Sequence, residues 1–139
     1  YDAPDSVGSG KSLILIGNSL YFGRTFTATH PELYILDNSD PTNLQGNNTT
    51  PFSQEIGSSV LGLAVRDYLA FVLTTTTGQF QVWDISNLAM IKHLAIPISL
   101  PNGGVGSAMD CEGNYFYIGS NDANGNGSIS IITATTEPE

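Results

Sequence analysis

Apolar and polar positions along this chain form short stretches separated by turn residues, and the stretch from 60 to 97 is the clearest example. Apolar residues alternate with small or polar ones over 61–66, which is the period of a β-strand. Every position of 68–73 is apolar, which is typical of a strand covered on both faces. The stretches 80–85 and 90–96 follow after further turns. This region therefore predicts four antiparallel strands joined in sequence.

The same order of strands and turns occurs before and after this region. The turns that precede each second strand contain Asn18, Asp67 and Asn114, which lie 49 and 47 residues apart. A repeat of about 40–50 residues with four strands is typical of a β-propeller blade. We therefore predict an all-β chain with about three propeller-type blades in a single domain, 1–139. The blades occupy approximately 11–56, 58–98 and 103–135.

The number of blades raises the question of closure, because closed propellers typically have about four to eight blades. The third repeat lacks a fourth strand, and the outer strand of the first is expected near 52–56. Three arrangements remain open. In the first, this chain is the C-terminal portion of a longer protein, because the segment that starts at Tyr1 reads like the tail of an earlier blade. Alternatively, two chains close a six-bladed homo-oligomeric ring, or the strands form a sandwich or an open stack.

Composition narrows the range of partners. The formal net charge is −9, with only four Lys and Arg residues, which disfavours nucleic acid and anionic membrane surfaces as partners. No stretch has the length and apolarity of a membrane span, so we expect no membrane insertion by this chain. The single cysteine, Cys111, lies in an apolar strand and is predicted to be a small buried residue.

One motif suggests a metal. Asp122, Asn124 and Asn126 follow the first half of a calcium loop, in which oxygen ligands alternate before a glycine. The match lacks the terminal Glu, because Thr133 occupies that position. The alternative is a hairpin loop, since Asn-Gly favours the positive φ of such turns. No other cofactor is predicted.

The remaining polar and aromatic residues are interpreted structurally. Asp37 and Asp84 end equivalent strands, and we expect them to accept backbone hydrogen bonds in the turns that follow. No catalytic cluster of residues is recognisable, so we predict that the chain is not an enzyme. A carboxylate pair for glycoside hydrolysis is not readable from sequence spacing and remains an alternative. The large aromatic residues are expected to pack between blades: Trp83, Tyr21, Tyr34, Tyr68, Tyr115 and Tyr117.

The repeats resemble the LVIVD-repeat family of bacterial β-propellers. The resemblance rests on GNSLYFG with LYILDNSDP, RDYLAFV with FQVWDISNL, and GNYFYIG with SISIIT. It covers nearly the whole chain, although Thr133 replaces the aspartate of the other copies. The opening segment also resembles the connection between blades in this family. The resemblance implies an extracellular or cell-surface bacterial protein. In some members of the family the propeller follows a pilin-like N-terminal segment. The resemblance implies no catalytic residues.

These observations predict a non-enzymatic extracellular or cell-surface module that contacts a protein or glycan. One form of this hypothesis makes the chain the exposed part of a pilin-like subunit. Two alternatives remain. The chain is a structural subunit that self-assembles through open blade edges, or it is a hydrolase or lyase that uses acidic residues on the propeller face.

Overall fold

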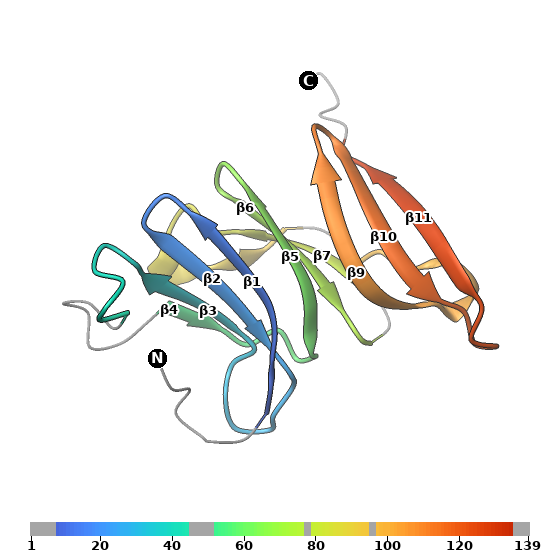
Figure 1. The fold of residues 1–139 in the computed structure, drawn as a ribbon, viewed down its shortest axis with the longest axis horizontal. Coiled ribbons are helices and arrows are strands. Elements are labelled where there is room, and N and C mark those ends of the chain that lie inside the picture. The colour runs from blue at the N-terminus through green and yellow to red at the C-terminus, as the bar shows by residue number, and fades with distance from the viewer. Residues whose placement is uncertain (1–7, 45–51, 77–78, 95–96, 135–139) are drawn as a thin grey trace.

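The computed structural model describes residues 8–44, 52–76, 79–94 and 97–134, and it is an all-β structure. Its strands form three antiparallel sheets, which lie side by side in sequence order (Figure 1). The sheets span residues 10–54, 60–93 and 105–133, close to the three predicted units.

The first sheet contains four strands in sequential order. They are β1 (Gly10–Ile16), β2 (Ser19–Arg24), β3 (Leu33–Asp37) and β4 (Phe52–Gln54). Gly17 adopts a φ of +56° in the turn between the first two strands, a conformation that glycine reaches without steric cost. The short β4 confirms the outer strand that the sequence predicts for this repeat.

The second sheet has the same sequential order. Its strands are β5 (Val60–Arg66), β6 (Leu69–Thr74), β7 (Phe80–Asp84) and β8 (Lys92–His93). All residues of β6 after Leu69 are buried, which confirms the prediction of a strand covered on both faces.

The fourth strand predicted over 90–96 is present as β8, which lies inside that stretch and pairs with β7 through two residues. A 3-10 turn, η1 (Leu88–Met90), precedes it and overlaps the predicted stretch only at Met90. The side chain of Asn87 accepts a hydrogen bond from the Ala89 N–H at 3.1 Å. The Asn87 carbonyl accepts another from the Met90 N–H at 2.8 Å. This local capping continues the turn to Met90, so the strand begins two residues later than predicted.

The third sheet has three strands, as predicted: β9 (Val105–Glu112), β10 (Tyr115–Asn121) and β11 (Gly127–Thr133). The order is β11-β10-β9, and a 3-10 turn, η2 (Pro101–Gly103), precedes it. A break in the pairing register recurs near the start of the first strand of every sheet. It lies at Gly10/Ser12, at Val60/Gly62, and opposite Gly119/Ser120. The three sheets are therefore structural repeats of one another.

The second sheet is the middle layer, and each of its faces contributes to a separate hydrophobic core. The core shared with the first sheet contains these buried residues: Tyr21, Ile35, Val60, Ala70, Val72, Trp83 and Ile85. The core shared with the third sheet contains a second set: Ala64, Phe71, Leu73, Phe80, Leu100, Phe116 and Ile118. Strand β5 lies against β1 on one side and against β9 on the other.

Close sheet packing depends on small residues at specific points. A Cβ added to Gly106 would lie 2.6 Å from a methyl carbon of Leu73, and one added to Gly23 would lie 2.4 Å from a methyl carbon of Val60. Each glycine therefore makes room for a branched side chain from the neighbouring sheet.

Two of the packing predictions are wrong. Cys111 is exposed at the hairpin end of β9 rather than buried. Tyr68, Tyr115 and Tyr117 are also exposed. Tyr21 and Trp83 lie in the core between the first and second sheets, as predicted, whereas Tyr34 is buried beside Phe22 and belongs to neither core. Tyr68 belongs to the turn after Asp67, whose φ is +53°, and β6 begins only at Leu69. The apolar pattern does not reveal whether another layer covers a given face of a strand.

Among the helical segments of the described residues, none has the length and apolarity that a membrane crossing requires. The opening segment that resembles an inter-blade connection falls mostly on residues 1–7, which lie outside the described residues.

Candidate interaction surfaces

The outer face of the third sheet is apolar and exposed. Alternation along β10 and β11 places Phe116, Ile118 and Ile132 in the core with the second sheet. The residues between them point the opposite way, and Ile129 and Ile131 are 77% and 60% exposed. We call this surface the forward face, and it comprises Tyr115, Tyr117, Ile129 and Ile131.

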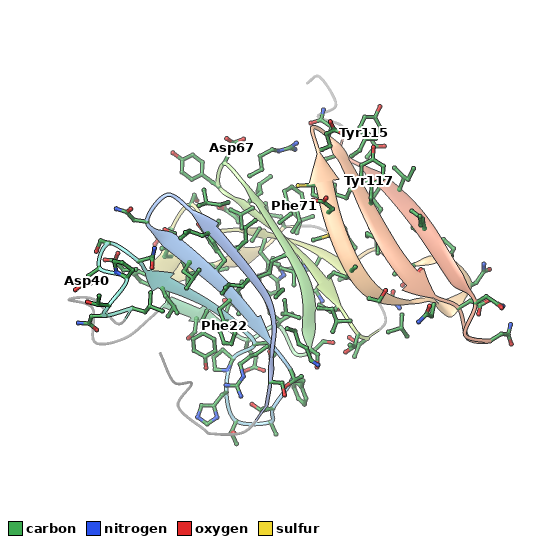
Figure 2. All side chains as sticks on the ribbon, in the orientation of Figure 1. Phe22, Asp40, Asp67, Phe71, Tyr115 and Tyr117 are labelled. Carbon is green, nitrogen blue, oxygen red and sulfur yellow. The ribbon has the colours of Figure 1, made fainter. Side chains whose placement is uncertain are left out.

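Figure 2 shows Tyr115 and Tyr117 on the side of the third sheet opposite Phe71, which points into the core between the second and third sheets. Their exposed phenol rings combine a flat apolar body with a polar tip, which suits contacts with proteins and with sugars. Beside β10 and β11 the surface also contains an open hollow of about 590 Å³. Small and polar residues dominate its lining: Ser107, Gly119, Ser120, Asn121, Gly127, Ser128 and Ile129.

The outer face of the first sheet is the second apolar surface. Ile14 contributes to the core, while Leu13 and Leu15 point away from it and are 64% and 55% exposed. Across the pairing register, Leu13 lies opposite Phe22 and Leu15 opposite Leu20. We call these four residues the backward face, and Phe22 extends away from the second sheet in Figure 2.

The backward face is less open than the forward face. The rings of Phe22 and Tyr34 are 6.3 Å apart between centroids, and Tyr34 is buried. A hollow of about 190 Å³ lies beside them and is lined by Gly10, Lys11, Ser12, Leu13 and Phe22. A Cβ at Gly10 would lie 2.8 Å from the Phe22 ring, so glycine at this position leaves room for the ring.

Two charged residues at the end of β2 and directly before β3 are fully buried, and neither was recognised from the sequence pattern. Glu32 is 0% exposed, and its Oε2 accepts hydrogen bonds from the Ile56 N–H at 2.8 Å and the Gly57 N–H at 3.0 Å. Arg24 is 1% exposed, and its backbone N–H donates to the Glu32 carbonyl at 2.9 Å. Burial raises the pKa of Glu55, and the negative charge of Glu32 raises it further.

These contacts give Glu32 a structural role. Its carboxylate fixes the backbone that leads from β4 into β5, and so it determines how the chain passes from the first sheet to the second. In the sequence, Glu32 is a single charged residue directly before an apolar strand. Charged residues are also common at exposed strand ends, so this pattern did not indicate burial.

The predicted calcium residues lie together in the loop between β10 and β11. Asp122 Oδ1 accepts hydrogen bonds from the N–H groups of Asn124 and Asn126, both at 2.8 Å. Its Oδ2 accepts from the Asn126 Nδ2 at 3.0 Å, and Gly125 adopts a φ of +83°. These hydrogen bonds from Asn126 and Asn124 lower the pKa of Asp122.

Asp122 thus organises the hairpin loop with both carboxylate oxygens. Within the ranges that the structure describes, no group of three or more His, Cys, Asp or Glu residues could hold a metal ion. Calcium binding by Asp122, Asn124 and Asn126 stays a prediction.

The expected turn role of Asp37 and Asp84 is confirmed. Asp37 Oδ1 accepts from the Ser39 N–H and Asp84 Oδ1 from the Ser86 N–H, each at 2.8 Å. The bonds from Ser39 and Ser86 lower the pKa of both carboxyls. These aspartates therefore close Asx-type turns at equivalent positions of two repeats.

A further contact joins the second and third sheets at their turns. The Arg66 guanidinium donates to the Gly113 carbonyl and, at 3.0 Å, to Asn114 Oδ1. Its central carbon also lies 5.8 Å from the centre of the Phe71 ring. Arg66 therefore fixes one end of the interface between these two sheets.

No protein-family model matches this chain, and none of the curated proteins matches it. Among solved structures, the chain is similar to a computationally designed protein known from the crystal structure of Ika4. The TM-score is 0.58 at 14% sequence identity, and the match covers 88% of this chain and 66% of the designed one. A likeness at this level of identity concerns the fold alone.

Proposed function

We propose that this chain is a non-enzymatic interaction module of propeller-type blades, displayed outside the cell or on a bacterial surface, which binds a protein or glycan partner. The blade interpretation is supported by three repeated antiparallel sheets whose first strands lie against one another. The resemblance to LVIVD-repeat propellers supports the surface location.

The observation that carries this proposal is the pair of exposed apolar sheet faces. Four large apolar or aromatic side chains lie exposed on the forward face, and Leu13 and Leu15 are the most exposed residues of the backward face. Monomeric soluble proteins seldom expose large contiguous apolar patches, and such patches commonly mark interaction sites. Tyrosine is also enriched at protein interfaces, where its ring packs and its hydroxyl remains hydrated.

Two of the acidic residues, Glu32 and Asp122, have partners that favour a structural role over a catalytic one. Glu32 is buried and engaged with two backbone N–H groups, and Asp122 has both oxygens occupied by its own loop. A glycosidase instead needs two carboxyl groups facing each other across an accessible bond.

The experiment compares binding of the chain to an array of glycans and to a panel of purified extracellular proteins. Four forms are compared: the unaltered chain, Ile131→Glu on the forward face, Leu13→Glu on the backward face, and Met90→Glu as control. Met90 is 58% exposed but belongs to η1, away from both faces. We expect Ile131→Glu to abolish binding that Met90→Glu retains. Binding that survives Ile131→Glu and Leu13→Glu alike would refute a role for these faces.

A second candidate is a structural subunit that assembles through an open strand edge. Strand β11 is at the edge of its three-stranded sheet, and its sequence GSISIIT contains no charge or proline to discourage pairing. This candidate predicts growth into large species with slowed hydrogen exchange at the β11 amides. Unchanged exchange in the assembled protein would exclude it.

A further inference from the structure

The three sheets correspond position by position. Counting from each hairpin turn, the second and third residue pairs between the second and third strands of one sheet match those of the other sheets. One row contains Leu20–Leu36, Ala70–Trp83 and Phe116–Ile132, and the next contains Tyr21–Ile35, Phe71–Val82 and Tyr117–Ile131. Each exposed residue of an end face can therefore be compared with its buried equivalents.

The residues of the forward face occupy the positions through which the first and second sheets each contact the following sheet. Tyr21 and Ile35 of the first sheet pack against the second sheet. Phe71 and Val82 of the second sheet pack against the third. Their equivalents in the third sheet, Tyr117 and Ile131, are exposed.

The residues of the backward face occupy the positions through which the second and third sheets each contact the preceding sheet. In the second sheet, Leu63 and Val65 pack against the first sheet. In the third sheet, the equivalent of Leu63 is Met109, which packs against the second sheet. The first-sheet equivalents of Leu63 and Val65 are Leu13 and Leu15, both exposed.

The two end faces are thus the two halves of an interface that the chain already forms twice internally. We propose that the forward face of one copy docks onto the backward face of a second copy, head to tail. This rests on the proposed function, because it names the partner of the same interaction surfaces. Stacking forward face on forward face has no counterpart inside the chain. A head-to-tail contact closes into a ring or continues as an open chain, depending on the rotation between copies.

The first measurement is the mass in solution by light scattering from about 1 μM to about 1 mM, where moderate affinities are resolved. We expect the unaltered chain to associate. Ile131→Glu and Leu13→Glu should each weaken association at least about tenfold, because a charge would be buried against apolar groups. Met90→Glu, an equally exposed control outside both faces, should associate like the unaltered chain. Thermal unfolding of each variant checks that the exposed substitutions leave the fold intact.

Mixing the two variants tests the head-to-tail direction. The Leu13→Glu chain keeps an intact forward face, and the Ile131→Glu chain keeps an intact backward face. An equimolar mixture should therefore form a heterodimer, although each variant alone is monomeric at the same concentration. If Leu13→Glu alone associates as strongly as the unaltered chain, the contact is symmetric and the proposal is wrong.

A chain that stays monomeric over the whole concentration range would also overturn the proposal. That result would leave the proposed function to be judged by the binding panel, where Ile131→Glu is compared with Met90→Glu on other proteins and glycans. The two failures are therefore distinguishable.

Discussion

Phe116 should be the side chain on which attachment of the third sheet to the second depends most. It is 1% exposed, and its ring centroid lies 4.3 Å from that of Phe71 and 5.3 Å from that of Phe80. Replacing a buried Phe with Ala typically costs about 3–5 kcal/mol of unfolding free energy, because burial is lost and a cavity remains. Since domains of this kind have total stabilities of about 5–15 kcal/mol, Phe116→Ala should remove at least about a fifth of the total.

The matched control is Tyr115→Ala. Tyr115 precedes Phe116 on the same strand but is 50% exposed on the opposite face, so its removal should cost within about 0.5 kcal/mol. Unfolding in denaturant is followed by far-ultraviolet circular dichroism and by the fluorescence of Trp83, which reports on the other core. Measurements belong at low protein concentration, because binding of a second copy adds stability. The packing argument is refuted if Phe116→Ala costs no more than Tyr115→Ala.

Three further predictions test other parts of the structure. Gly106→Val should destabilise the fold by about 1–3 kcal/mol in thermal unfolding, because even the Cβ of the new side chain would overlap Leu73. The control Gly119→Ala should be nearly neutral, because a Cβ at that position meets only ordinary contacts. The folded-state pKa of Asp84 lies below its usual 3.8, so the stabilising contribution of this carboxylate is present above that value and is lost as the pH falls through the folded pKa. The difference in unfolding free energy between the unaltered chain and Asp84→Ala should therefore shrink in acid. A difference that stays constant with pH would contradict this. Glu32→Ala should lower the midpoint of denaturant unfolding by the equivalent of about 1–3 kcal/mol, because two backbone N–H groups lose their acceptor, and Glu32→Gln, which keeps one acceptor oxygen, should cost less.

The candidate surfaces were only partly accessible to sequence reasoning. The turn roles of Asp37 and Asp84 could be predicted, because an aspartate bonds the backbone two residues further on. The buried Glu32 was missed because its partners, the amides of Ile56 and Gly57, lie more than twenty positions away. Open faces were expected at the two ends of a three-blade stack, but the sequence did not show which apolar strand residues lie on them.

The strands, most of the turns and the threefold repeat follow from the sequence alone, because alternation of side chains and turn chemistry act over a few residues. The start of the fourth strand of the second sheet was placed two residues early, because the side chain of Asn87 caps a 3-10 turn that continues to Met90. Which face of each strand is covered depends instead on the neighbouring sheets. Phe71 and Tyr117 occupy equivalent positions with similar aromatic character, yet one is buried and the other exposed. The physical reason is that burial depends on the next sheet in the stack, and the third sheet has none within the chain that the structure describes.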